Sequence, residues 1–240
     1  MAPTKAAKKK SATAPKSSRT ATKGASADRS APKSVPKAAR NAKPKKGAKV
    51  ESTAPERATV LSSKVVFQGP LFRVLRDTVI EPTGLRSTRD LVRHNGSVVI
   101  LAVDTSASKK NPWVVMERQY RHAANQFLWE LPAGKLDPGE EPLSGAQREL
   151  SEETGYRARK WRPLVSYYPS PGFLGEAMLV YLAEDLYTGE AHPEEDERIE
   201  LRLVKLSEIL KMIEKGAIHD GKTLSAILLY AWLLGRKRKK

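Results

Sequence analysis

The sequence predicts an α/β or α+β domain in which strands and helices pack as layers. Three observations support this fold class. Short apolar runs separated by Gly- and Pro-containing turns fill residues 64–117, a helical segment covers 142–154, and two apolar helical segments cover 206–234. A chain that mixes strands and helices in this way buries its strands against its helices. No internal repeat is visible, so a repeat architecture is not indicated.

The elements can be placed in chain order. Turns at Gly69-Pro70 and Pro82-Thr83-Gly84 separate the first strands, and Val98–Val103 is a continuous apolar run that suits a central strand. Pro142–Thr154 is predicted to be helical, because proline suits the first helical turn and Gly155 supplies a C-terminal stop. The expected strands are 65–67, 72–75, 90–92, 98–103, 112–117, 164–168, 178–182 and 199–204, and the expected last helices are 206–214 and 222–234.

Positive charge is concentrated at the two ends of the chain. Of the formal net charge of +16, residues 1–50 contribute +14, from fifteen Lys or Arg and one acid. Residues 236–240 contribute +5, which leaves −3 for 51–235. Residues 1–57 consist almost entirely of Lys, Ala, Pro, Ser and Thr, and cannot bury enough apolar surface to fold. We therefore expect a disordered basic tail at 1–57, a domain at 58–235 and a basic C-terminal tail at 236–240.

Composition excludes several classes of protein. The absence of cysteine excludes disulfides, thiolate nucleophiles and Cys-ligated zinc. The longest apolar stretch, Thr223–Leu234, is shorter than the ~20 residues that span a bilayer, and the N-terminus lacks the apolar core of a secretory signal. We expect no membrane partner and a cytoplasmic location, to which the basic tail could add association with a nucleoid or nucleus. The four histidines have no metal-ligand spacing and are expected to be structural or exposed.

The chemistry is carried by residues 134–156, which read GKLDPGEEPLSGAQRELSEETGY. Glu149, Glu152 and Glu153 are spaced i, i+3 and i+4, so they share one face of the predicted helix. Like charges at this spacing repel by ~0.2–0.5 kcal/mol per pair. A hard divalent cation removes the repulsion, since Mg²⁺ prefers carboxylate and water oxygens, and the same ion could bind a diphosphate and acidify a water molecule.

A solvated Glu-rich helix is the alternative interpretation of these glutamates. Arg148 and Arg157 would then be salt-bridge partners of the exposed carboxylates. The glutamates alone do not exclude this alternative. The additional presence of Gly134, Gly155, Glu140 and Arg148, at the spacings of a known protein family, favours the metal site.

The whole 134–156 segment is similar to the Nudix box of the Nudix hydrolases, in which Gly, Glu, Arg-Glu-aliphatic, Glu-Glu and Gly-aliphatic recur at fixed spacings. Only the last position departs, where Tyr156 replaces an aliphatic residue. The resemblance extends over about 60–235 and is to the ADP-ribose pyrophosphatase branch. Arg118–Arg121 with Glu130–Gly134 resembles the approach to the box, and Ser170-Pro171-Gly172 resembles a loop that contacts substrate.

The resemblance implies a Nudix α/β/α sandwich with a mixed sheet, preceded by a small β-subdomain at about 60–95. Such subdomains exchange across a homodimer in this branch. The implied metal ligands are the Ala133 carbonyl, Glu149, Glu153 and Glu197. The implied general base is Glu195, in an acidic loop whose register the sequence leaves open, and Glu152 is a further carboxylate near the metal and the next candidate base. The implied substrate-binding residues are Arg121, Glu130, Glu176 and, facing the partner's substrate, Arg89.

The function implied is Mg²⁺-dependent hydrolysis of the diphosphate of a nucleoside diphosphate sugar, with Mn²⁺ as an alternative ion. ADP-ribose, giving AMP and ribose 5-phosphate, is the leading substrate, and GDP-mannose or a related compound is the alternative. A nucleic-acid-associated protein that only senses nucleotide is an alternative of another class, although a binder would not need every carboxylate. The basic tail predicts non-specific nucleic-acid binding through phosphates, or is a solvated extension.

Overall fold

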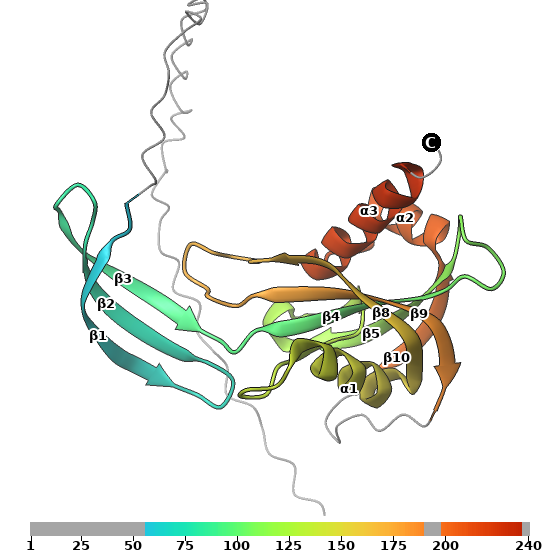
Figure 1. The fold of residues 1–240 in the computed structure, drawn as a ribbon, viewed down its shortest axis with the longest axis horizontal. Coiled ribbons are helices and arrows are strands. Elements are labelled where there is room, and N and C mark those ends of the chain that lie inside the picture. Colours follow the sequence, from blue (N-terminus) through green and yellow to red (C-terminus); the bar gives the residue numbers. More distant parts are fainter. Residues whose placement is uncertain (1–55, 190–197, 237–240) are drawn as a thin grey trace, which may run out of the picture. The chain divides into compact units, whose positions relative to one another are not determined.

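The computed structural model describes residues 56–189 and 198–236, all within one compact unit, Ala54–Lys240. Almost all of the two expected basic tails, and the acidic residues 194–197, lie outside the described residues. The described part forms two sheets and three α-helices (Figure 1). None of the helices in 56–189 and 198–236 is long and apolar enough to cross a membrane.

The first sheet is antiparallel and has the strand order β1-β2-β3. Its strands are β1 (Thr59–Gln68), β2 (Arg73–Ile80) and β3 (Arg86–Arg93). Gly84 has φ +82° in the turn between β2 and β3, a conformation that glycine adopts without strain. Every residue of β1 is exposed. Beyond this sheet, the backbone N–H of Val92 on β3 donates to the carbonyl of Phe173 at 2.8 Å.

The second sheet is mixed and has the strand order β10-β5-β4-β9-β8. Only β4 and β9 pair in parallel, while β6 pairs antiparallel with β5 and β7 with β4. Its strands are β4 (Ser97–Asp104), β5 (Trp113–Arg121), β6 (Gln126–Glu130), β7 (Ala133–Lys135), β8 (Tyr156–Tyr167), β9 (Met178–Thr188) and β10 (Glu200–Lys205).

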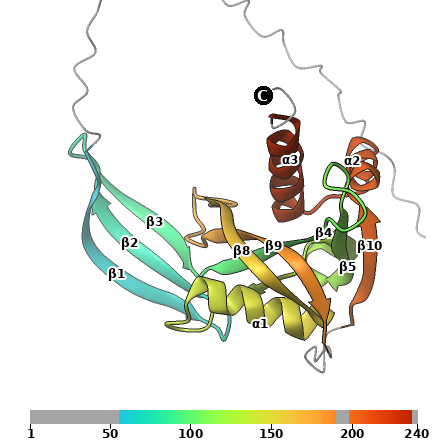
Figure 2. The ribbon, with the colours of Figure 1, turned by 45° about the vertical axis from the view of Figure 1, so that its right-hand side comes forward.

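Helices cover both faces of this second sheet, with β4 at its centre. Val98 and Ile100 of β4 pack on one face with Ala146 and Leu150 of α1 (Pro142–Thr154). The alternate residues of β4 pack on the other face, in a cluster that includes buried side chains of α2 (Leu206–Glu214) and α3 (Gly221–Arg236). Figure 2 shows α1 and the pair α2 and α3 on opposite sides of the sheet. The predicted α/β sandwich with a mixed sheet is therefore confirmed.

Two parts of the second sheet were not expected from the sequence. The short strands β6 and β7 lie where only the approach to the box was recognised. Strand β8 begins at Tyr156, whereas the expected strand began at Leu164. Its first half is rich in arginine and lysine and lacks an apolar run, so its strand conformation depends on pairing with β9. Pro163 is tolerated because β8 is an edge strand.

Candidate functional site

A pocket of about 400 Å³ is lined by all three residues of β7. Helix α1 and the first turn of α3 contribute to its walls, and so does strand β7. The other lining residues lie at the end of β5, at or just before the starts of β4 and β9, and in the β1–β2 loop. This pocket brings together residues that are distant in the sequence, from Leu71 to Lys222.

The first wall of the pocket is acidic and is formed by α1. Glu149 and Glu153 are nearly buried, with 9% and 5% of their surface exposed, whereas the Glu152 side chain is 43% exposed. The N–H of Ala133 donates to Glu153 Oε2 at 3.1 Å. Gly134 lies so close to α1 that a Cβ there would be 1.9 Å from the carboxyl carbon of Glu149. Only glycine therefore lets β7 and this carboxylate approach each other.

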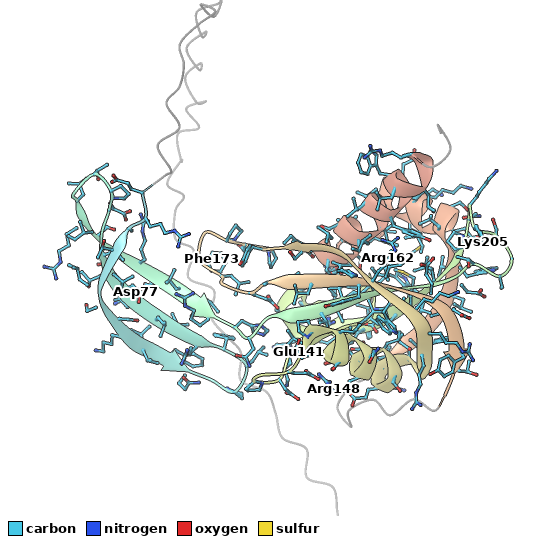
Figure 3. All side chains as sticks on the ribbon, viewed as in Figure 1. Asp77, Glu141, Arg148, Arg162, Phe173 and Lys205 are labelled. Atoms are coloured by element: carbon cyan, nitrogen blue, oxygen red, sulfur yellow. The ribbon has the colours of Figure 1, made fainter. Side chains whose placement is uncertain are left out.

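Arg148 of α1, labelled in Figure 3, holds two carboxylates of the acidic wall by hydrogen bonds. Its guanidinium donates to both oxygens of Glu140 at 3.0 Å, to Glu149 at 2.8 Å and to Glu152 at 3.0 Å. The hydrogen bonds to Glu140, followed by the nearby carboxylate charges, raise the pKa of Arg148 above its usual range. The bond from Arg148, with one from the Asp137 N–H, holds the pKa of Glu140 below its usual range. Glu140 and Arg148 thus order the loop before α1 and fix the direction in which the α1 carboxylates point.

The second wall carries two cations, Arg121 at the end of β5 and Lys222 at the start of α3. Both contact the fully buried carboxylate of Glu130: Arg121 Nη2 lies 2.8 Å from Oε2, and Lys222 Nζ also pairs with Oε2. Burial alone would raise the pKa of Glu130. The hydrogen bond from Arg121 and the charge of Lys222 outweigh that effect, so the pKa of Glu130 lies below its usual range.

The third wall contains Glu176, which lies just before β9. Its Oε1 accepts a hydrogen bond from Ser97 Oγ at 2.5 Å and lies 3.5 Å from His94 Nδ1. The backbone N–H of Gly96 donates to the same His94 nitrogen at 3.1 Å. These contacts hold Glu176 at the pocket surface.

The structure gathers most of the predicted site residues. Those that line the pocket are Ala133, Glu149, Glu152, Glu153, Arg121 and Glu176. Glu130 lies behind Arg121 and Lys222 and does not line it. Arg89 lies on β3, where its Nη2 is 2.6 Å from Glu81, and it does not line the pocket of this chain. Glu195 and Glu197 lie outside the described residues. The roles assigned to all of these residues remain predictions.

Besides Gly134 of the box, six residues of the walls were not among the predicted site residues: Leu71, His94, Ser97, Lys135, Met178 and Lys222. The expectation that the histidines are structural or exposed gave His94 no part in the site. The only local signal for Lys222 is that Asp220 caps α3, with Oδ2 accepting from the Thr223 N–H at 2.9 Å. A cap marks the start of a helix but does not say which way the neighbouring side chain points.

The chemistry of the acidic wall fits a hard divalent cation. All its donors are carboxylate oxygens, beside the backbone of Ala133, and Mg²⁺ prefers such ligands. Among residues 56–189 and 198–236, no three acidic or histidine side chains form a complete metal cluster. The burial of Glu149 and Glu153 disagrees with a solvated helix face, and Arg157 donates to Ser151 Oγ at 3.3 Å.

Comparison with known proteins agrees with this geometry. The NUDIX domain family matches residues 93–227. An ADP-ribose pyrophosphatase of Bacillus subtilis is 40% identical over 169 residues, which cover 70% of this chain and 89% of that protein. A GDP-mannose pyrophosphatase of Citrobacter koseri is 31% identical over 186 residues, or 70% of this chain and 92% of that protein. A crystal structure of an ADP compounds hydrolase has a TM-score of 0.65 at 23% identity, covering 78% of this chain and all of that one, which supports the same fold.

Proposed function

The chain belongs to the Nudix family, and from this premise we propose that it hydrolyses the diphosphate of ADP-ribose to AMP and ribose 5-phosphate. One observation carries the proposal: the three box glutamates, Arg121 and Glu176 line a single pocket. An acidic wall for a cation and a basic wall for phosphate oxygens are the two features that a diphosphate hydrolase needs.

Nudix hydrolases generally use divalent metal ions, and we propose Mg²⁺ here, with Mn²⁺ able to replace it. The Ala133 carbonyl, Glu149, Glu153 and Glu197 would hold it. When bound, the ion would offset the charge of the diphosphate and acidify a water molecule. Arg148 and the Ala133 N–H fix Glu149 and Glu153 before substrate arrives, so little reorganisation accompanies the reaction.

The general base is proposed to be Glu195. A carboxylate that holds a cation is a poor base, because the cation lowers its proton affinity, whereas a loop carboxylate near the attacking water can accept a proton. The water oxygen attacks one phosphorus, the bond from that phosphorus to the bridging oxygen breaks, and the water proton passes to Glu195. Glu152 is the next candidate, since it is the most exposed of the box carboxylates that line the pocket.

The roles proposed for Glu195 and Glu197 can be separated by measuring the reaction rate as a function of Mg²⁺ concentration. Glu195→Gln should lower kcat strongly with little change in KM or in the Mg²⁺ requirement. Glu197→Gln should raise the Mg²⁺ concentration that gives half the maximal rate. If the two phenotypes were exchanged, the assignment of roles along residues 194–197 would be shifted by two residues. If both variants kept full activity, Glu152 would become the candidate base.

A second candidate substrate is GDP-mannose, because the C. koseri relative covers the same share of this chain. The box contacts only phosphate and metal, so base and sugar must be recognised by other walls of the pocket. Turnover of a panel of nucleoside diphosphate sugars, including ADP-ribose and GDP-mannose, tests both candidates. A higher kcat/KM for ADP-ribose supports the first, and failure to cleave any nucleotide sugar would reject both.

We also propose a homodimer, in which Arg89 faces the partner's substrate. Every residue of β1 is exposed, including Val65 and Phe67, which are half exposed. Exposed apolar side chains gathered on one strand favour an association site there. In sedimentation velocity, Phe67→Lys should shift dimer to monomer while Thr83→Lys, in the β2–β3 turn, should not. A wild-type monomer at micromolar concentration would reject the proposal.

The tail of residues 1–57 is proposed to bind nucleic acid without sequence preference. The net positive charge lies in the tails, because residues 1–50 carry +14 and 236–240 carry +5, whereas 51–235 carries −3. Lysines that neutralise phosphates release counterions. Deleting 1–57 should remove DNA binding but leave hydrolysis unchanged. Binding by the full chain should follow a log–log salt slope of about −0.9 per neutralised phosphate. Salt-independent binding, or binding that survives the deletion, would contradict the role.

A further inference from the structure

Lys222 occupies an unusual position for a lysine. It is the second residue of α3, and its side chain is only 10% exposed. The small part that remains accessible faces the same pocket as the α1 carboxylates. Burying an ammonium group is costly unless it is paired, so this lysine requires partners.

The two carboxylates that pair with Lys222 do not line the pocket. Its Nζ pairs with Glu130 and lies 3.2 Å from Asp220 Oδ1, and neither acid lines the pocket. Arg121 has the same arrangement, since it lines the pocket and pairs with Glu130 behind it. A ligand that enters therefore meets these two cations as well as Lys135, whereas the carboxylates that pair with Arg121 and Lys222 do not line the pocket.

The geometry leaves Lys222 with capacity to bind. An ammonium group has three N–H donors, and its two carboxylate partners use at most two of them. The partners also fix its position, so little side-chain entropy remains to be lost when a ligand arrives. Stability alone does not explain the network, because apolar residues of similar volume usually stabilise a protein as well as a buried ion network does.

We propose that Lys222 and Arg121 form an anion subsite that binds the diphosphate of the substrate, with Glu130 as the positioning residue for both cations. This inference rests on the proposed diphosphate hydrolysis for its ligand. Lys222 and Arg121 line the same pocket as the α1 carboxylates, so a diphosphate bound there can contact both the cation-binding wall and the two basic side chains. Glu130 contacts no substrate in this arrangement, and its effect passes through Arg121 and Lys222.

The test uses the full-length protein with Mg²⁺ and two ligands. Methylenediphosphonate is a diphosphate analogue without base or sugar, and its affinity is measured by titration calorimetry. ADP-ribose turnover gives kcat and KM. Lys222→Met removes the charge at similar length, Lys222→Arg keeps the charge, and Lys211→Met on the exposed surface of α2 is the matched control. Thermal unfolding verifies that each variant is folded, and Lys222→Gln replaces Lys222→Met if the latter does not fold.

Lys222→Met should bind methylenediphosphonate about 10- to 100-fold more weakly, the range that corresponds to one charge-assisted hydrogen bond. It should raise KM for ADP-ribose more than it lowers kcat. Lys222→Arg should restore most of the affinity, which a merely structural role would not explain, and Lys211→Met should match wild type. Wild-type affinity in folded Lys222→Met, or no recovery in Lys222→Arg, would overturn the subsite. If wild type binds the diphosphonate through Lys222 but hydrolyses no nucleotide sugar, the proposed function fails and the subsite stands.

Discussion

Gly134→Ala is expected to disable the site without unfolding the protein. The added Cβ would lie 1.9 Å from the carboxyl carbon of Glu149 and 2.0 and 2.3 Å from its oxygens. Ordinary contact begins at 3.4 Å, so the carboxylate must move by about 1.5 Å. The obstructing atoms are the end of a flexible side chain, so the backbone of β7 can stay in place while Glu149 turns away from the pocket.

The magnitude follows from this displacement. Misplacing a reacting group by about 1 Å costs ~100-fold in rate, and a tenfold change in rate corresponds to about 1.4 kcal/mol of activation free energy. We therefore expect Gly134→Ala to lower kcat for ADP-ribose at least ~100-fold and to raise the Mg²⁺ requirement. Gly235→Ala, near the end of α3 with no atom within 4 Å of the new Cβ, is the control and should keep full activity. Folded Gly134→Ala with more than half the wild-type kcat would refute the reasoning.

Three further outcomes are expected. Glu153→Gln should lower kcat by orders of magnitude at an unchanged melting temperature, and near-normal turnover would remove Glu153 from the metal ligands. Thr223→Val deletes the 2.8 Å bond from the buried Leu131 N–H, so urea unfolding should show a loss of about 1–3 kcal/mol, and an unchanged midpoint would contradict this. The pKa of Glu130 is lower in the folded than in the unfolded protein, so its ionised carboxylate stabilises the fold above the unfolded pKa of ~4.3. This stabilisation is lost as the pH falls through the pKa of the folded state. The free energy of unfolding, measured with urea at a series of pH values, should therefore fall less steeply with decreasing pH in Glu130→Gln than in wild type. Parallel pH dependences of the two proteins would refute the assignment.

The sequence was sufficient where structure depends on local signals. Helix α1 has its predicted bounds, because Pro142 starts it and Gly155, with φ +69°, ends it. Strand β4 was predicted because a continuous apolar run has few alternatives to a central buried strand. The box carboxylates could be assigned to one site, since regular helical spacing places them on one face.

The sequence was insufficient where position depends on tertiary packing. The first half of β8 is a strand only because β9 pairs with it. Lys222 reaches the pocket because α3 packs against the sheet beside β6, a contact between residues 92 positions apart. The same packing buries Glu130 between two cations, which no local pattern around an isolated glutamate could indicate.

Hydrolysis of ADP-ribose in ¹⁸O-labelled water, followed by mass spectrometry of the products, tests the central claim most directly. Full-length protein with Mg²⁺ should release AMP and ribose 5-phosphate, with one ¹⁸O atom in the phosphate of one product. The reaction should stop when the metal is chelated and should be nearly absent in Glu153→Gln, which controls for contaminating phosphatases. Absence of labelled products, or equal label release by wild type and Glu153→Gln, would contradict metal-dependent attack of water on the diphosphate in this pocket.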